Sequence, residues 1–152
     1  MTRLETGDRA PTPTATDDRG RAVSLADLVA GKLVLYFYPK AFTPGCTTES
    51  CDFRDRHEAM RRAGYEIVGV SPDPPEVLAE FRSRHRLPFP LLSDPGHVVA
   101  AAFGAWGTKK NYGREYEGLI RSTFVIEGGT IRDAWYNVKA DGHAARVAGS
   151  VA

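Results

Sequence analysis

The segment from Leu33 to Tyr38 is apolar or aromatic at every position, ends at Pro39 and precedes a helix-forming stretch from Pro44 to Ala63. A strand without polar alternation is typical of a parallel sheet that is covered on both faces. Glu66 to Val70 is a second run with the composition of a strand. Strand, helix and strand in this order predict a βαβ unit with adjacent or near-adjacent parallel strands. We therefore expect an α/β domain.

Turn and helix-start signals place further elements around this unit. The first twenty residues, with Pro11 and Pro13, are expected to form a loop and a short hairpin. Ser24 and Asp27 resemble a capping box, which predicts a short helix that ends at Gly31. Ordered structure is therefore expected to start close to these first twenty residues, before the first buried strand.

After the βαβ unit, the pairs Asp-Pro at 73–74 and at 94–95 mark the starts of two more helices. The two leucines at 91–92 predict a short strand between them. The composition up to Gly118 predicts a polar loop. The C-terminal third thus has to supply the remaining strands beyond Gly118.

Two runs of strand character, 122–126 and 131–136, flank the pair Gly128-Gly129. A Gly-Gly pair between two such runs indicates a hairpin, which adds an antiparallel edge to the sheet. Residues 141–151 are predicted to form a last helix. The expected fold is a thioredoxin-like α/β domain, with a central mixed β-sheet and helices on both of its faces.

Composition is consistent with a single domain over residues 1–152, because 42% of the residues are hydrophobic and 26% are charged. The formal net charge is +1 and no basic block stands out, so we expect neither a nucleic-acid partner nor a membrane-surface partner. The N-terminus lacks the apolar stretch of a signal peptide, and no segment approaches the roughly 20 apolar residues of a membrane span. A cytoplasmic location is expected.

The chain has two cysteines, Cys46 and Cys51, and both fall in the helix that follows the first buried strand. Thr43 can cap this helix and Pro44 suits its first position, which places Cys46 in the first turn. The partial positive charge of a helix N-terminus favours a thiolate there. In a reducing compartment, such a pair is expected to be catalytic or redox-sensing rather than structural. Two cysteines with scattered histidines do not make a zinc site, so no metal or cofactor is expected.

On a helical wheel, the two cysteines fall on different faces of the predicted helix. Glu49, Phe53 and Met60 fall within roughly 60° of Cys46, whereas Cys51 lies about 140° away. The same geometry puts the two Cα atoms about 8.6 Å apart, and a disulfide needs less than about 7 Å. A bond between the cysteines therefore requires the first turns of the helix to unwind. The arrangement suits a thiolate that attacks a peroxide, becomes a sulfenic acid and then condenses with the second cysteine.

A family resemblance adds to these observations. Pro39, Thr43 and Cys46 match the Pro-x-x-x-Thr-x-x-Cys signature of peroxiredoxins. The run Thr-Pro-Gly-Cys-Thr-Thr-Glu-Ser-Cys is similar to that of the bacterioferritin-comigratory-protein (BCP/PrxQ) subfamily, and the likeness extends over about residues 7–147. The resemblance implies a thioredoxin-like fold in which Cys46 is the peroxidatic cysteine and Cys51 the resolving one. It also implies that Thr43 orients the peroxide and that Pro39 shields the thiolate from water.

The resemblance further assigns Arg121 as an arginine that stabilises the thiolate and the charge that develops as the O–O bond breaks. Glu49 shares the helix face of Cys46, where an unpaired carboxylate would oppose a thiolate. We therefore expect Glu49 to hold the Arg121 guanidinium in place.

The activity implied is reduction of hydrogen peroxide and small organic hydroperoxides by a monomer, with a thioredoxin-like dithiol as the reductant. Two alternatives stay open. A thioredoxin-like disulfide oxidoreductase is disfavoured by the spacing, because that chemistry uses Cys-x-x-Cys. A non-enzymatic redox sensor would oxidise slowly and only once per molecule.

Overall fold

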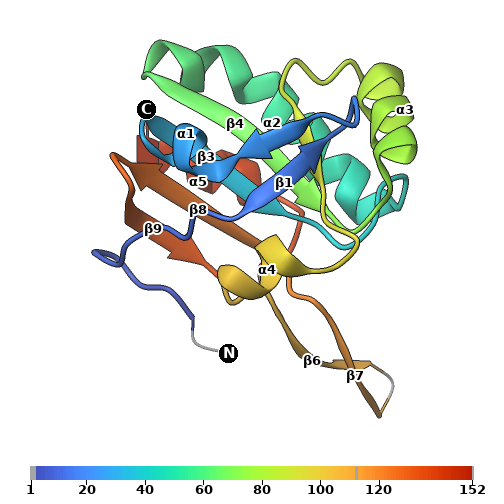
Figure 1. Ribbon diagram of the computed structural model, residues 1–152. Helices are drawn as coiled ribbons and strands as arrows, with labels where there is room; N and C mark the ends of the chain where they lie inside the picture. The colour runs from blue at the N-terminus through green and yellow to red at the C-terminus, as the bar shows by residue number, and fades with distance from the viewer. Residues whose placement is uncertain (1–2, 112, 152) are drawn as a thin grey trace.

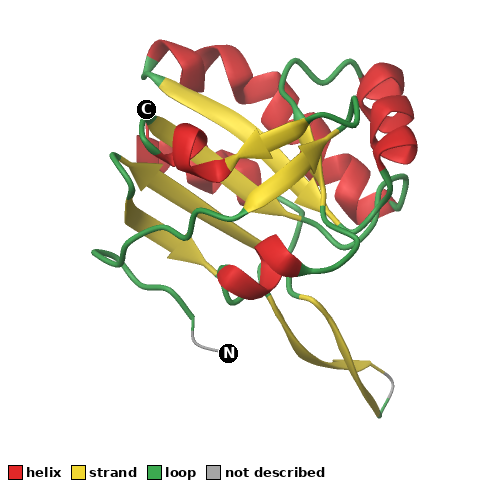
Figure 2. Ribbon diagram, in the orientation of Figure 1, coloured by secondary structure: helices red, strands yellow, loops and turns green. Residues whose placement is uncertain are grey.

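A mixed seven-stranded sheet forms the centre of the computed structural model, which describes residues 3–111 and 113–151. The first two residues and the last residue of the expected 1–152 domain lie outside the described part. Figures 1 and 2 show the sheet with helices on both sides. In sheet order, the strands are β2 (Ala22–Ser24), β1 (Thr14–Asp17), β5 (Leu91–Ser93), β4 (Tyr65–Ser71), β3 (Lys32–Phe37), β8 (Ser122–Glu127) and β9 (Thr130–Trp135).

The central strand β3 is parallel to β4 on one side and antiparallel to β8 on the other. Its residues alternate between two hydrophobic clusters: Leu33 and Leu35 pack into one, and Val34 and Tyr36 into the other. All four side chains are fully buried. The prediction of a strand covered on both faces, followed by a parallel neighbour, is confirmed.

Five helices of the described residues cover the two faces of the sheet. Two short ones pack into the cluster that contains Leu33, and the three longer ones pack into the cluster that contains Val34. The thioredoxin-like fold class, a mixed sheet flanked by helices, is thus confirmed. On the first face lie α1 (Leu25–Val29) and α4 (Val98–Ala102), and on the second α2 (Pro44–Arg62), α3 (Pro75–His85) and α5 (His143–Val151). Within the described residues, none of these helices combines the length and hydropathy that crossing a bilayer requires.

The polar loop expected up to Gly118 is wrong. Strands β6 (Trp106–Asn111) and β7 (Arg114–Leu119) form an antiparallel ribbon that projects from the body of the molecule (Figure 1). Polar cross-strand contacts join its strands, such as the hydrogen bond from Thr108 to Glu117 at 3.0 Å. Because little of this ribbon is buried, its strands carry no apolar alternation that could have revealed them.

The two predicted helix caps are also wrong in their side-chain detail. Ser24 and Thr43 occupy the N-cap positions of α1 and α2, yet neither hydroxyl accepts a hydrogen bond from its helix. The Thr43 hydroxyl instead donates to the carbonyl of Lys40 at 2.8 Å. Phe42, between these two residues, has a φ of 65°, so the loop turns sharply just before α2. This turn directs the Thr43 side chain back toward the loop.

Helix α2 is fastened to the sheet through Tyr36. The Tyr36 ring stacks on Phe53 with ring centroids 4.6 Å apart, and its hydroxyl forms a 2.9 Å hydrogen bond with Ser50. Gly69 of β4 leaves the room for this ring, because a Cβ at that position would lie 2.8 Å from Cζ of Tyr36. The segment of α2 between the two cysteines therefore rests on a rigid part of the sheet.

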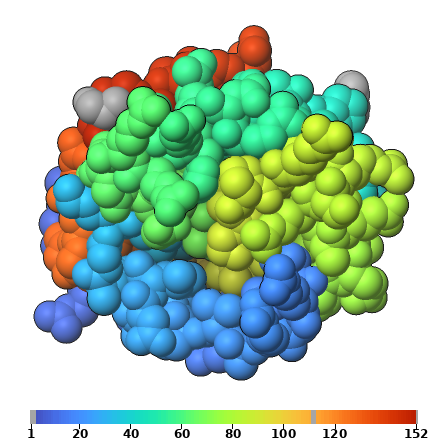
Figure 3. Space-filling model, turned by 90° about the horizontal axis from the view of Figure 1, so that it is seen from above, coloured from blue at the N-terminus to red at the C-terminus, as the bar shows by residue number. Residues whose placement is uncertain are grey.

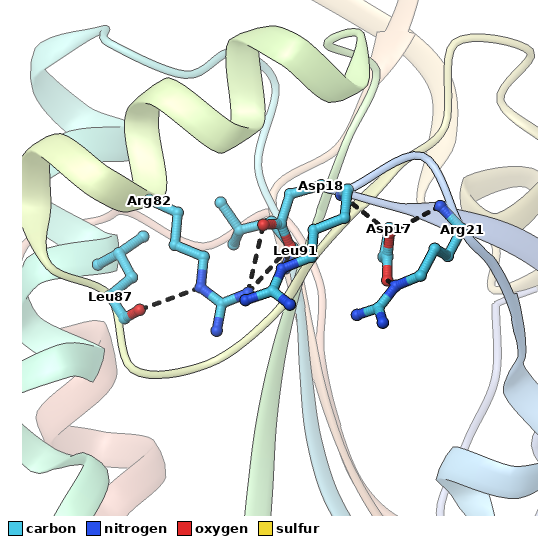
Figure 4. A network of polar contacts seen from close by, with 7 residues as sticks. Asp17, Asp18, Arg21, Arg82, Leu87 and Leu91 are labelled. Atoms are coloured by element: carbon cyan, nitrogen blue, oxygen red, sulfur yellow. Dashed lines mark hydrogen bonds and ion pairs between the residues drawn. The ribbon is translucent and has the colours of Figure 1, made fainter.

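Helix α3 is fastened separately. Arg82 of α3 pairs with the buried carboxylate of Asp18 at 3.2 Å, and the same carboxylate accepts the backbone N–H of Leu91 at 3.1 Å (Figure 4). Arg82 also donates to the carbonyl of Leu87 at 3.2 Å. Figure 3 shows α3, in yellow-green, beside the β1–β2 hairpin, in blue. The C-terminal half of α3 is thus tied to the edge of the sheet.

Candidate active site

Cys46 lies in the first turn of α2, directly after the loop that follows the central strand. Pro44 occupies the first position of the helix, as expected. The Cys46 side chain is fully buried, and its Sγ accepts a hydrogen bond from Nη2 of Arg121 at 3.2 Å. The start of a helix and a guanidinium therefore meet at the same sulfur, and both favour negative charge there.

Arg121 reaches this position from the short connection between β7 and β8, 75 residues further along the chain. Its second nitrogen, Nη1, donates to Oε1 of Glu49 at 2.5 Å. Gly45 lies against the guanidinium, since a Cβ there would be 3.4 Å from Nη2. The contact that the charge argument predicted between Glu49 and Arg121 is present, and one guanidinium joins Glu49 to Cys46.

Glu49 is a fully buried carboxyl group, so its charge state depends on its surroundings. Burial raises its pKa to about 7, and this is the balance left after the charge and hydrogen bond of Arg121 lower the pKa in part. Its second oxygen, Oε2, has no hydrogen-bond partner among the described residues. The carboxyl therefore changes its protonation near neutral pH, beside the cysteine and the arginine.

Thr43 and Pro39 belong to the loop between β3 and α2. Both are half-buried, and the carbonyl of Thr43 accepts the backbone N–H of Thr47 at 2.9 Å, which begins the helix. Both residues thus lie on the segment that leads directly to Cys46. Their predicted roles toward a peroxide stay predictions.

Cys51 follows on the same unbroken helix but in different surroundings. It is half-buried, and its Sγ lies 3.8 Å from Nδ1 of His85, at the end of α3. Both cysteines are free thiols. Both cysteines lie within the single helix Pro44–Arg62, and ideal helix geometry puts their Cα atoms about 8.6 Å apart. The two sulfurs cannot bond without a local change in α2.

Two residues near the cysteines were missed by the sequence analysis. His85 had no companion at helical spacing, and its contact with Cys51 depends on how α2 packs on α3. Lys109, on the ribbon that was expected to be a loop, lies close to Arg121: burial lowers its pKa and the charge of Arg121 lowers it further. Lys109 and Ile120 line a hollow of about 280 Å³.

We compared this site with other hollows and side-chain clusters in the described part of the chain. A larger hollow of about 550 Å³ lies at the β8–β9 turn, where Arg9 and Gly129 contribute to its lining, and neither cysteine borders it. Within residues 3–111 and 113–151, no three His, Cys, Asp or Glu side chains gather as metal ligands would. The cysteines, Arg121 and Glu49 therefore form the candidate active site.

The thioredoxin-like fold and a buried cysteine facing an arginine define the class of the peroxiredoxins. Residues 6–134 match the model of the AhpC/TSA family. Peroxiredoxin Bcp of Bacillus subtilis is 49% identical over 144 residues, which cover 93% of this chain and 91% of that protein.

Solved structures agree with this assignment. The bacterioferritin comigratory protein of Xanthomonas campestris is 34% identical, with a TM-score of 0.86 and coverage of 95% of this chain and 97% of that one. PrxQ of Xylella fastidiosa is 30% identical, with a TM-score of 0.90 and coverage of 99% and 96%. The chain therefore belongs to the AhpC/TSA family and, within it, to the Bcp/PrxQ peroxiredoxins, which are thiol peroxidases. The resemblance drawn from the sequence is confirmed.

Proposed function

We propose that Cys46 is the peroxidatic cysteine of this thiol peroxidase and that it reduces hydrogen peroxide and small organic hydroperoxides. Its thiolate attacks the O–O bond, water or an alcohol leaves, and the sulfur becomes a sulfenic acid. The contact of 3.2 Å between Arg121 and Cys46 carries this proposal. A fixed guanidinium stabilises the thiolate before attack and the oxygen charge that develops as the O–O bond breaks.

Three further residues complete the proposed site. Glu49 holds the guanidinium through its contact with Nη1. The Thr43 hydroxyl donates its hydrogen bond to the backbone carbonyl of Lys40, so its oxygen lone pairs are available to accept the O–H of a peroxide and orient it. Pro39 has no backbone N–H and shields the thiolate from water.

The organic part of the substrate class has support from a relative. The Xanthomonas campestris protein is described by its alkyl peroxide reduction activity. Its similarity to this chain spans both chains almost completely, which supports including alkyl hydroperoxides beside hydrogen peroxide.

In the second half of the proposed cycle, Cys51 is the resolving cysteine. Its sulfur displaces the oxygen of the Cys46 sulfenic acid, and an intramolecular disulfide forms after the first turns of α2 have opened. A thioredoxin-like dithiol then reduces this disulfide by thiol–disulfide exchange, so that the chain needs no bound cofactor.

Rapid mixing of the reduced protein with hydrogen peroxide, followed by mass analysis of its thiols, tests both halves. Cys46→Ser should abolish peroxide consumption. Cys51→Ser should consume one equivalent of peroxide and then fail to turn over with thioredoxin. Equal peroxide consumption by the wild type and Cys46→Ser would refute the assignment of Cys46. Thioredoxin-driven turnover by Cys51→Ser at the wild-type rate would refute the role of Cys51.

A further inference from the structure

The contact between Cys51 and His85 has no role in the attack on peroxide. The two residues come from different helices, and Nδ1 of His85 lies 3.8 Å from the Cys51 sulfur, within hydrogen-bonding distance for sulfur. Both side chains are half-buried. A neutral imidazole nitrogen at this distance can accept the proton of a thiol.

The His85 ring is held in a defined orientation. It packs edge-on against Phe81 with ring centroids 5.0 Å apart, and its backbone carbonyl accepts a hydrogen bond of 2.8 Å from Arg54 of α2. Arg82, one turn earlier on α3, is paired with Asp18 (Figure 4). His85 therefore stays fixed to the body of the protein while the start of α2 opens.

Cys51 needs such a partner because its surroundings keep it protonated. Burial raises the pKa of its thiol, the charge of Arg54 lowers it, and the charges of Asp55 and Asp52 raise it. These three charged residues belong to α2, and His85 is the group that faces Cys51 from α3. The thiolate is the nucleophile in disulfide formation, so the resolving step requires removal of this proton.

We propose that His85 is the proton acceptor for Cys51 in the resolving step, a role that rests on the proposed peroxidase function. Nδ1 takes the thiol proton while α2 is wound, and the Cys51 thiolate then reaches the Cys46 sulfenic acid as the helix opens. The S–S bond forms and the S–O bond breaks, so that the Cys46 sulfur is reduced and the Cys51 sulfur oxidised. The oxygen leaves as hydroxide and becomes water, and the proton held by His85 returns to solvent, which balances the step.

Two substitutions separate proton transfer from packing. His85→Gln removes the imidazole, and His85→Phe keeps an aromatic ring against Phe81 but has no nitrogen. His57→Gln is the matched control, because His57 is a half-buried histidine on α2 that packs against Phe89. The reduced full-length proteins are mixed with hydrogen peroxide from pH 6 to pH 9.5, and Cys46 sulfenic acid and the disulfide are quantified separately by mass analysis.

We expect both His85 variants to form the disulfide about tenfold more slowly at pH 7, with unchanged oxidation of Cys46. The difference in the rate of disulfide formation between the wild type and the His85 variants should disappear toward pH 9.5, where hydroxide can remove the Cys51 proton. His57→Gln should form the disulfide at the wild-type rate at every pH. Disulfide formation at the wild-type rate in both variants, or a slowdown that persists at every pH, would overturn the role of His85. A wild-type protein whose Cys46 is not oxidised would instead overturn the peroxidase proposal itself.

Discussion

Cys46 and Cys51 lie five residues apart on one helix, yet their surroundings are opposite in character. Cys46 is fully buried against a permanent cation, the Arg121 guanidinium at 3.2 Å. Cys51 is half-buried, has a thiol pKa raised by burial and faces the imidazole of His85 at 3.8 Å. The difference shows that helix position alone does not prepare a cysteine for chemistry. The groups that meet each sulfur come from other parts of the chain: the Arg121 guanidinium, from the connection between β7 and β8, contacts Cys46, and His85, at the end of α3, contacts Cys51.

Removing the Arg121 guanidinium should slow the reaction of Cys46 with peroxide. For Arg121→Met, we expect the rate constant of Cys46 oxidation by peroxide to fall by about 10²–10³, the loss typical of a missing oxyanion donor. The rate constant should fall less in Arg121→Lys, because the lysine ammonium keeps the positive charge. Some loss should remain, because an ammonium cannot contact Cys46 and Glu49 together as a planar guanidinium does. Rapid-mixing kinetics at pH 7 measures both variants.

The control for this experiment is Arg62→Met, which removes an exposed arginine that pairs with Glu58 at the far end of α2. Thermal unfolding establishes that each variant is folded. A similar loss of rate in the control and in Arg121→Met would show that general charge, rather than the contact with sulfur, sets the reactivity of Cys46.

The second prediction concerns the buried carboxyl of Glu49, which lies beside Cys46 and Arg121. The folded protein holds the Glu49 proton up to a pKa of about 7, whereas the unfolded chain releases it near 4.5. The protonated carboxyl therefore contributes stability below about pH 4.5, and this contribution is lost as the pH rises to about 7. Relative to Glu49→Gln, the wild type should lose at most about 3 kcal/mol of unfolding free energy over this range.

Denaturant unfolding of the wild type and of Glu49→Gln at pH 4.5, 6 and 8 measures this difference. Glu58→Gln removes an exposed carboxylate on the same helix, and its unfolding free energy should not differ from that of the wild type in this pH-dependent way. Unfolding free energies of the wild type and Glu49→Gln that run parallel across the three pH values would contradict the prediction.

The smallest effect concerns Ser50, which lies between the two regions. Ser50→Ala leaves the buried Tyr36 hydroxyl without its partner, and we expect the unfolding free energy to fall by about 1–2 kcal/mol. Tyr36→Phe combined with Ser50→Ala should cost less than the two single substitutions together. Urea unfolding of the four proteins measures this coupling, and strictly additive effects would show that the hydrogen bond does not hold α2 to the sheet.

Much of the fold could be predicted because its signals are local. The apolar run of β3 and the Gly-Gly turn before β9 each depend on a few consecutive residues. The shared face of Cys46 and Glu49 follows from helical periodicity, and the charge argument then required a cation beside Glu49.

The remainder depends on contacts that no local pattern carries. The β6–β7 ribbon is mostly exposed, so its strands have no apolar alternation. His85 meets Cys51 across 34 residues because α3 packs beside α2, and nothing in the spacing of its own helix indicates this. The Thr43 hydroxyl turns toward Lys40 because of the backbone turn at Phe42. The preference of threonine for N-cap positions carries no information about that turn.

Placing both cysteines on α2 gives the helix a timing role in the proposed cycle. A sulfenic acid at Cys46 persists for as long as the first turns stay wound. During that interval, a second peroxide can carry the same sulfur on to the sulfinic acid, which thiols do not reverse. Substitutions that merely tighten or loosen the start of α2 would therefore set the peroxide dose at which the protein inactivates itself, without altering either cysteine.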